Sequence, residues 1–498
     1  MHPPIKIADR MVGDGRPAFI IAEAGVNHNG DVDKAFELIR VAKRAGADCV
    51  KFQTFKAERV VTQSAPKASY QMRVSDPAES QLSMLKKLEL SEDAYADLIA
   101  LCDREGIIFT STPYNEEDIE FLDSLGVPLL KSASIHIAEP RFLQRMAETG
   151  RPLVVSTGMA TWDEIDEAVR AIRSTGNENF VLLQCTTNYP SRLADTNLRA
   201  MVSMRERFDC NVGYSDHTQS HAPCIGSIAL GACVVEKHLT LDRAMSGPDH
   251  LTSESPEEFA TLVTSIREME VAMGSPEKAP TEAERANMPG MRRSIVARRA
   301  IAKGSPIEDD DLTCRRPLSG IPPREWEQLL GRIALRDIPA GEMLERSALG
   351  QFRRMRADDL PALERMLSAE STDYMQHFLA FAKAGELTRQ FTQASQDVFF
   401  TIEAGGELAG FYCLRGFDAG YARPTFGLYV ASVFSGQGLG RAALAHALDT
   451  CRGLNVSQVM LKVAPTYERA RLIYETAGFV ATGVCPDTGH TIMNREVA

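Results

Sequence analysis

The sequence predicts an α/β protein of three consecutive parts: a (β/α)₈ TIM barrel, a small β-rich domain and a second α/β domain. Eight short apolar runs alternate with amphipathic helical segments within about 270 residues, which is the pattern of a (β/α)₈ barrel. Beyond them a short sequence repeats once, and a Gly-rich turn that opens a helix follows later. We expect domains over residues 1–275, 289–350 and 351–498.

Length and composition are those of a globular protein that can bury substantial cores. The chain has 498 residues, of which 44% are hydrophobic, and a formal net charge of -12. This charge argues against a nucleic-acid partner but allows a local cationic pocket for a small anion. No signal peptide or membrane-spanning run is recognisable, so we expect a cytoplasmic protein. The ten cysteines form no CxxC pair, which favours reduced core residues over disulfides or structural zinc.

The eight predicted barrel strands end in polar residues. In order they are Phe19–Glu23, Cys49–Gln53, Ile107–Thr112, Leu129–Ser134, Leu153–Ser156, Val181–Gln184, Val212–Ser215 and Val234–His238. Active sites of this fold lie at the C-terminal strand ends. The polar residues found there are Glu23, Lys51, Gln53, Thr112, Lys131, Ser134, Ser156, Ser215, His217 and His238.

Two lysines stand inside apolar runs. An unpaired ammonium group is costly to bury, so Lys51 and Lys131 should each meet an anion or a carboxylate. Together with four hydroxyl residues they predict a pocket for phosphate and carboxylate groups. The alternative is that they pair with Glu23 and Glu236 and only hold the barrel together.

The last two predicted strands each carry a histidine, His217 and His238. Adjacent parallel strands lie about 4.8 Å apart, so two imidazoles at the same depth can converge on one cation. Nitrogen ligands suit Mn, Fe, Co or Zn. The nearby Asp216, Glu236 and Asp249 favour a metal site over two histidines that are merely satisfied by hydrogen bonds.

Five motifs carry a family resemblance. They are Ala22–Gly30 (AEAGVNHNG), Val50–Thr54 (VKFQT), Ser156–Met159 (STGM), Gly213–Thr218 (GYSDHT) and Glu236–Thr240 (EKHLT). Over residues 17 to about 350 the chain resembles the sialic acid synthase family, whose members condense phosphoenolpyruvate with an N-acylated hexosamine to make nonulosonic acids.

The resemblance implies roles for individual residues. His217 and His238 would hold Mn²⁺, or Mg²⁺ or another divalent cation, which polarises the aldehyde of the open-chain sugar. Glu23 would direct water to C2 of the enol-pyruvate. The residues that would hold phosphoenolpyruvate are Lys51, Thr112, Lys131, Ser134, Ser156 and Ser215. Those that would face the sugar or the metal are Gln53, Thr187, Tyr189 and Asp249.

One position departs from the family pattern. The family usually has a small residue and then a Glu after Ser134, where this chain has Ile135 and His136. An imidazole cannot accept the same pair of hydroxyl hydrogen bonds as a carboxylate, so a role for His136 in reading the sugar would alter specificity. A packing role for His136 is equally open. The hexosamine, ManNAc or a 2,4-diacetamido-trideoxyhexose, is therefore undetermined.

Residues 275–289 read as a linker, and an internal repeat follows. Ile301–Leu312 matches Ile338–Leu349 at a spacing of 37 positions, which suggests a small pseudo-symmetric β domain. It resembles the antifreeze-like (SAF) domain of the same family. In those relatives the domain swaps across a dimer and sends an arginine into the partner's site, and the matching residue here is Arg316. We therefore expect a domain-swapped homodimer.

Residues 351–498 predict a hairpin about Gly405–Gly406, a third strand at Phe426–Val430 and a Gly-rich turn. They resemble the GNAT acetyltransferases. The resemblance implies that acetyl-CoA is cradled by Gly436, Gln437, Gly438, Leu439, Gly440 and Arg441, and that Tyr474 protonates the departing thiolate. Two positions depart from the family: Ser435 stands where Arg or Gln is usual, and Tyr467 where Asn is usual. A decayed domain kept for packing is the alternative.

Together these features predict a bifunctional enzyme that condenses phosphoenolpyruvate with an amino sugar and N-acetylates an amino sugar of the same pathway. One alternative is another phosphoenolpyruvate-dependent 3-deoxy-sugar acid synthase. The other is a sugar-phosphate-binding regulator on a barrel scaffold.

Overall fold

The computed structural model describes residues 2–67, 72, 79–381 and 383–497. The chain divides into two compact units, Met1–Glu277 and Lys278–Ala498. Among the residues described, no helix combines the length and the apolar character needed to cross a bilayer. All ten cysteines are free; Cys314 is partly exposed and the others are buried.

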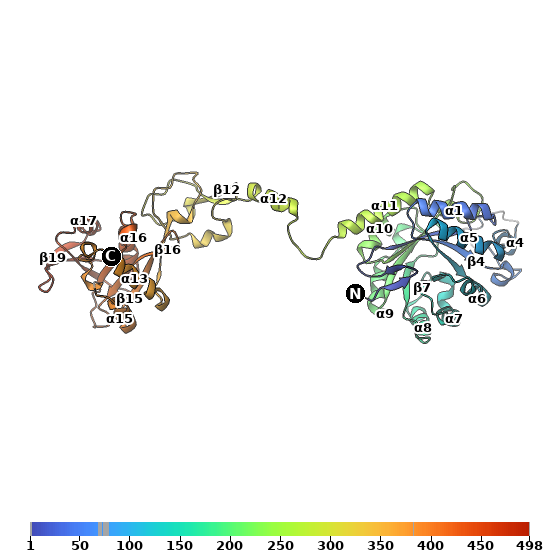
Figure 1. Ribbon diagram of the computed structural model, residues 1–498, viewed down its shortest axis with the longest axis horizontal. Helices are drawn as coiled ribbons and strands as arrows, with labels where there is room; N and C mark the ends of the chain where they lie inside the picture. The colour runs from blue at the N-terminus through green and yellow to red at the C-terminus, as the bar shows by residue number, and fades with distance from the viewer. Residues whose placement is uncertain (1, 68–71, 73–78, 382, 498) are drawn as a thin grey trace. The chain divides into compact units, whose positions relative to one another are not determined.

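The first unit is a parallel, nearly closed eight-stranded barrel surrounded by helices (Figure 1). Its strands are β3 (Phe19–Gly25), β4 (Cys49–Thr54), β5 (Ile108–Pro113), β6 (Leu130–Ser132), β7 (Leu153–Ser156), β8 (Phe180–Cys185), β9 (Asn211–Asp216) and β10 (Val234–His238). Thr110 Oγ1 donates to the Leu129 carbonyl at 2.9 Å and so links the β5 edge to β6. All eight predicted strands are confirmed.

Each barrel strand is followed by amphipathic helical sequence whose apolar face packs on the sheet. The helices are α1 (Val32–Arg44), α2 (Ala57–Val60), α4 (Gln81–Lys86), α5 (Glu92–Glu105), α6 (Glu116–Ser124), α7 (Pro140–Glu148), α8 (Trp162–Arg173), α9 (Arg199–Phe208), α10 (Ala222–Ala229) and α11 (Pro256–Met273). In α8, a capping box between Thr161 and Glu164 starts the helix, and Ile165, Val169 and Ile172 face the core.

A hairpin that the sequence analysis did not predict precedes the barrel. Strands β1 (Ile5–Ile7) and β2 (Arg10–Val12) pair antiparallel. Ile5, Ile7 and Val12 join an apolar cluster with Phe19 and Val234, the first residues of two barrel strands. The hairpin therefore closes the N-terminal end of the barrel with apolar side chains, and the polar residues gather at the opposite end.

The second unit begins with a helix where the sequence analysis expected only a linker. Thr281 caps α12 (Glu282–Met291) through a capping box with Glu284. The segment over residues 275–289 that was predicted as a linker therefore contains most of this helix. The capping box forms because the Thr281 hydroxyl satisfies a free backbone N–H of the first turn, and Pro289 is tolerated near the helix end.

The internal repeat folds as a pair of equivalent elements that contact each other. Its strands are β11 (Ser294–Ala297), β12 (Leu312–Arg315), β13 (Ile333–Ala334) and the start of β14 (Leu349–Arg354). Ile301 and Ile338, which are equivalent positions of the two copies, exchange backbone hydrogen bonds at 2.8 and 2.9 Å. The two copies are thus arranged pseudo-symmetrically about this pair, and their apolar residues form one small core.

One mixed sheet joins the repeat domain to the rest of the second unit. Its further strands are β15 (Val398–Ala404), β16 (Glu407–Arg415), β17 (Thr425–Val430), β18 (Gln458–Val463), β19 (Val480–Val484) and β20 (Thr491–Glu496). The predicted hairpin about Gly405–Gly406 is present, and β14 pairs along β15 from Gly350 to Arg354. Leu335 of the repeat domain also packs in the apolar core that contains Ile402. The two parts of the unit therefore share a sheet and a core.

Helices α13 (Leu360–Ala369), α14 (Thr372–Met375), α15 (Glu386–Gln393), α16 (Leu439–Gly453) and α17 (Glu468–Thr476) complete the second unit. α16 buries Leu439, Ala443, Ala447 and Cys451 along one face against the sheet, as the spacing of small and apolar residues requires.

Candidate active sites

Glu23 and Lys51 meet at the C-terminal end of the barrel. They stand opposite each other in the β3–β4 register, and Lys51 Nζ lies 2.5 Å from Glu23 Oε2. Lys51 also donates to Thr112 Oγ1 at 2.9 Å, and Gln53 Nε2 donates to Glu23 Oε1 at 3.0 Å. Burial raises the pKa of Glu23, and Lys51 opposes this effect. A buried carboxylate held by two donors can orient a water molecule or a sugar hydroxyl.

Lys131 and Glu236 form a second buried pair at the same end. Lys131 Nζ donates to Ser156 Oγ at 2.8 Å and lies 3.4 Å from Glu236 Oε1, which accepts a hydrogen bond from Ser215 at 2.9 Å. Burial lowers the pKa of Lys131, and Glu236 opposes this effect. Both lysines thus pair with a glutamate, Lys51 with Glu23 and Lys131 with Glu236. The two ion pairs lie among the hydroxyl groups expected to bind phosphoenolpyruvate.

Gly158 leaves open a small polar cradle beside these pairs. A Cβ atom at this position would overlap the hydroxyl oxygens of Thr187 and Ser134. Ser134 Oγ accepts from the Gly158 N–H at 3.1 Å, and Thr187 Oγ1 is buried without a hydrogen-bond partner. A buried hydroxyl without a partner can donate a hydrogen bond to an anion or a sugar oxygen.

His217 and His238 face each other at the ends of β9 and β10. Their ring centroids are 5.4 Å apart, and the Tyr189 ring lies 4.2 Å from His217. His217 Nδ1 bonds the Thr186 carbonyl at 2.7 Å, which requires a proton on Nδ1 and leaves Nε2 free. His238 Nδ1 is buried without a partner. Burial, and to a smaller extent His217, lowers the pKa of His238 well below its ordinary value, so the ring is neutral and one of its two nitrogens has a lone pair for a cation.

These two imidazoles fit a divalent cation because each presents an unused nitrogen. Over residues 2–67, 72, 79–381 and 383–497, no group of three or more His, Cys, Asp or Glu side chains is placed to hold a metal ion. Further ligands at such a site would be water or substrate oxygens. Asp249 is buried near Glu23, and burial raises its pKa to about 6, with Glu23 adding to the effect.

Asp216 does not join the two histidines, although it directly precedes His217 in the sequence. Its carboxylate accepts from Lys237 Nζ at 2.6 Å and from Tyr214 OH at 2.9 Å, and Lys237 lies 3.4 Å from Glu254. Successive side chains of a strand point to opposite faces, so Asp216 lies behind the barrel wall while His217 points into the mouth. Lys237 and Glu254, which sequence reasoning missed, form with Asp216 a buried structural cluster.

His136 is buried in a short 3-10 helix, Ser134–Ala138. Its ring stacks on Phe142 at 4.0 Å, and its Nδ1 lies 3.0 Å from Glu139 Oε2. Its Nε2 is buried without a partner. The ring therefore has a packing contact on one side and one unused polar atom. This is compatible with a packing role and with a role in reading the sugar.

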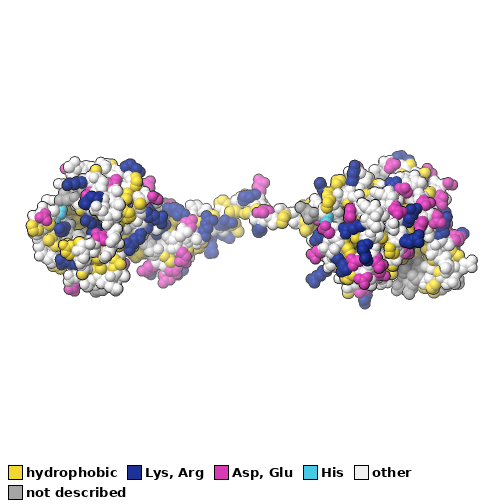
Figure 2. Space-filling view, turned by 90° about the horizontal axis from the view of Figure 1, so that it is seen from below, with side chains coloured by type: hydrophobic (Ala, Val, Ile, Leu, Met, Phe, Trp, Pro, Cys, Tyr) yellow, Lys and Arg dark blue, Asp and Glu magenta, His cyan; other side chains and the backbone are white. Residues whose placement is uncertain are grey.

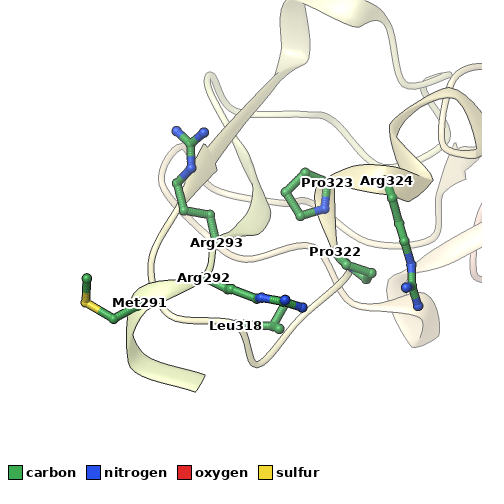
Figure 3. A pocket seen from close by; sticks show the side chains of 7 residues that line it. All are labelled: Met291, Arg292, Arg293, Leu318, Pro322, Pro323 and Arg324. Atoms are coloured by element: carbon green, nitrogen blue, oxygen red, sulfur yellow. The ribbon is translucent and has the colours of Figure 1, made fainter. Parts of the chain in front are cut away.

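Arg316 is exposed, directly after β12 of the repeat domain. A groove of about 500 Å³ lies on the same domain, and its lining residues are Met291, Arg292, Arg293, Leu318, Pro322, Pro323 and Arg324. Figure 3 shows that the Arg292 side chain extends toward Leu318, whereas Arg293 points away on the other side. This lining combines apolar surface with arginines and contains no carboxylate.

The second unit has a larger cavity, of about 580 Å³, lined by residues of β17, the Gly-rich turn, α16 and α17. A single residue pair, Thr425 and Met460, joins β17 to β18. Beyond it the cavity is lined by Leu428 and Val430 of β17 and by Tyr467 and Ala470 near α17. Because β17 pairs with β18 at Thr425 alone, the backbone edge of β17 near Leu428 can pair with the amide groups of an extended ligand.

The Gly-rich turn forms one end of this cavity. Gly436 and Gly438 have φ of +84° and +88°, a conformation that favours glycine, and α16 begins directly after them. The turn residues lining the cavity are Gly436, Gly438, Leu439, Gly440 and Arg441; Gln437 does not line it. The first amides of a helix are unpaired within it and attract phosphate groups.

Tyr474 of α17 also lines the cavity. Its ring packs near Phe426 and Phe479, and burial raises the pKa of its hydroxyl above the ordinary value. Tyr467 also lines the cavity, and its ring stacks on His377 at 4.1 Å. A protonated phenol beside the slot can donate a proton to a leaving group.

Three family models match the chain in order. They are the NeuB family over residues 38–278, the SAF domain over 292–349 and the Acetyltransferase (GNAT) family over 362–479. These matches agree with the three predicted parts.

Curated relatives match about two thirds of the chain. The N,N'-diacetyllegionaminic acid synthase of Campylobacter jejuni is 42% identical over 66% of this chain and 99% of its own length. That of Legionella pneumophila is 44% identical over 67% of this chain and 94% of its own. Among solved structures, the N-acetylneuraminic acid synthetase of Leptospira borgpetersenii is 30% identical, covers 58% of this chain and 95% of its own, and has a TM-score of 0.52.

Proposed function

Because the chain belongs to the NeuB family, we propose that its barrel condenses phosphoenolpyruvate with an N-acylated hexosamine, and that its C-terminal domain N-acetylates an amino sugar with acetyl-CoA. The chain is a synthase of nonulosonic acid biosynthesis with a GNAT N-acetyltransferase domain. The substrates, the metal and the residue roles are proposals. They rest chiefly on two buried Lys–Glu pairs and two half-satisfied histidines at the same end of one barrel.

In the barrel, Lys131 and Lys51 would bind the phosphate and carboxylate of phosphoenolpyruvate, assisted by the hydroxyls of Thr112, Ser134, Ser156 and Ser215. Two ammonium groups offset the substrate's negative charge, and the hydroxyls fix its orientation. Glu23, held by Lys51 and Gln53, would orient the water that attacks C2 after the new C–C bond forms. Phosphate then leaves from C2.

His217 and His238 would hold a divalent cation such as Mn²⁺, which when bound supplies Lewis-acid stabilisation of the charge developing on the sugar oxygen. Tyr189, beside His217, would pack against the sugar, with Thr187 donating a hydrogen bond. Burial raises the pKa of Asp249 to about 6. Its carboxylate would accept a hydrogen bond from a sugar hydroxyl and would take up or release a proton near neutral pH.

The names of two relatives favour a 2,4-diacetamido-trideoxyhexose over ManNAc as the sugar, because both are N,N'-diacetyllegionaminic acid synthases. A product with two N-acetyl groups requires two acetylation steps. A GNAT domain on the same chain could supply one of them, using the Gly436–Arg441 turn for the cofactor and Tyr474 as proton donor.

We further propose a homodimer in which Arg316 reaches the barrel of the partner subunit. The exposure of Arg316, and a groove on the same domain that combines apolar surface with arginines, support a docking role for this domain. An arginine at the barrel mouth would pair with substrate oxygens and help exclude water.

Phosphate release tests the proposal for the barrel. The purified chain with Mn²⁺ and phosphoenolpyruvate should release phosphate with a 2,4-diacetamido-trideoxyhexose, more slowly with ManNAc, and not with pentoses. Release with pentoses or pentose phosphates alone would indicate another 3-deoxy-sugar acid synthase. Phosphoenolpyruvate binding without turnover across the panel would favour a regulator.

A further inference from the structure

Three cationic side chains surround the Gly-rich turn of the second unit. Lys303 Nζ donates to the Gly436 carbonyl at 2.6 Å. The Arg469 guanidinium lies 3.1 Å from the position that a Cβ of Gly436 would take, and Arg441 lines the same cavity. Figure 2 shows both basic and acidic side chains over the repeat domain of this unit.

No carboxylate among the described residues forms an ion pair with any of the three cations. An ammonium group has three N–H donors, and Lys303 uses one of them on the Gly436 carbonyl. Three neighbouring positive charges repel one another, and a bound dianion would relieve that repulsion. Ser435, which precedes the turn, is uncharged, so Arg441 is the only cation between residues 435 and 441, and further charge to balance a pyrophosphate must come from other residues.

Lys303 belongs to the repeat domain, 133 positions before Gly436. It stands in a tight turn, Ala302–Ser305, and its backbone N–H donates to Asp337 Oδ1 at 2.8 Å. Its stem passes 3.5 Å from the Cβ position of Gly438, so a side chain there would meet it. The lysine is thus directed at the turn by a fixed loop.

The second copy of the repeat provides an internal comparison. Its equivalent position is Ala340, and the glycines that follow, Gly304 and Gly341, have similar φ of +83° and +85°. The repeat therefore forms its turn without a lysine, and the folding of the repeat does not explain Lys303.

We propose that Lys303 of the antifreeze-like domain binds the pyrophosphate of acetyl-CoA, so that the cofactor site of the acetyltransferase spans two domains. This inference rests on the proposed acetyltransferase function. It gives the antifreeze-like domain a second role, in which one copy of its repeat serves the acetyltransferase domain of the same chain.

Calorimetric titration of the full-length chain with acetyl-CoA tests the proposal. Lys303→Met keeps the stem and removes the charge, and it should weaken binding by about ten-fold, the scale of one charge-assisted hydrogen bond. Lys303→Arg should bind within about three-fold of wild type. Lys383→Met removes an exposed lysine of the same unit that does not line the cavity, and it should change nothing.

The cofactor analogue that lacks the 3'-phosphate identifies the group contacted. The loss caused by Lys303→Met should be as large with acetyl-3'-dephospho-CoA as with acetyl-CoA. If Lys303→Met causes no loss of affinity for acetyl-3'-dephospho-CoA, the pyrophosphate assignment is overturned. Wild-type affinity in Lys303→Met would overturn the inference while leaving the acetyltransferase proposal intact, whereas no binding by the wild-type chain would remove both.

A measurement on the wild-type chain guards against a variant that fails to fold. Saturating acetyl-CoA should slow the reaction of Lys303 with an amine-reactive ester several-fold, followed by peptide mass spectrometry, with Lys383 as the internal reference. Equal labelling of Lys303 with and without cofactor would contradict the proposal.

Discussion

The imidazole rings of His217 and His238 face each other across adjacent strands with centroids 5.4 Å apart. Among the residues that the structure describes, Thr186 bonds only Nδ1 of His217, and His238 Nδ1 has no hydrogen-bond partner, so each ring keeps one unused nitrogen. The proposed site for a divalent cation rests on these two nitrogens.

His217→Ala or His238→Ala should therefore abolish condensation and lower the Mn²⁺ content of the purified chain, because one ligand cannot retain the ion. Acetylation should persist, since it is assigned to the other unit. His221→Ala, at the start of α10, is the matched control. Retention of full phosphate release by either of the first two variants would exclude the assignment.

The buried lysines allow a second prediction that separates binding from stability. Lys131→Met should raise the KM for phosphoenolpyruvate at least ten-fold, because a charged hydrogen bond contributes about 1.5–3 kcal/mol. Lys237→Met should instead lower the thermal unfolding midpoint of the barrel, because it leaves Asp216 buried without its cation, at a cost of about 3–5 kcal/mol, whereas Glu254 keeps Arg243. If Lys131→Met affects only the unfolding midpoint, its pair with Glu236 serves to hold the barrel together.

His136 gives a prediction about specificity. A carboxylate at this position would lie beside Glu139, so His136→Glu is best made together with Glu139→Gln. If His136 reads the sugar, the double variant should change the ranking of kcat/KM among hexosamines, with little change in the KM for phosphoenolpyruvate. Glu139→Gln alone is the control. An unchanged ranking would make His136 a packing residue against Phe142.

The burial of Tyr474 leads to a prediction about the pH dependence of acetylation. Burial raises its pKa above the ordinary value of 10.0, so the phenol keeps its proton as pH rises toward 10 and the rate should show no alkaline decline from this group. Tyr474→Phe should lower kcat about a hundred-fold or more and leave the Kd for acetyl-CoA unchanged. Tyr421→Phe, at an exposed position outside the cavity, is the control. A wild-type decline below pH 9.5 that is absent from Tyr474→Phe would contradict the protonated role.

Arg316 predicts complementation between subunits. Arg316→Ala and His217→Ala should each be inactive in condensation. In a mixed dimer one barrel keeps both histidines and receives Arg316 from the other chain, so co-expression should restore at most about half of wild-type activity. Mixed dimers can be purified through two different tags. If they remain inactive, Arg316 acts on the barrel of its own chain or takes no part in the reaction.

The sequence by itself determined the barrel and the strand ends that carry its polar residues. Every barrel strand is covered on both faces and therefore reads as a continuous apolar run, which is a local signal. The α12 helix could also have been predicted from the sequence, because Thr281 and Glu284 form a recognisable capping box. The β1–β2 strands, three residues each, are too short to give a periodic signal.

Only the tertiary structure decided which polar residues meet. Asp216 and His217 are neighbours in sequence, yet the alternation of a strand sends one to Lys237 and the other to the barrel mouth. Lys303 and Gly436 are 133 positions apart, and they are in contact because β14 joins the two parts of the second unit in one sheet. Periodicity and motifs report on the chain within a few turns of a helix or strand. Contacts across such distances depend on how the elements pack, and that is fixed only when the whole core forms.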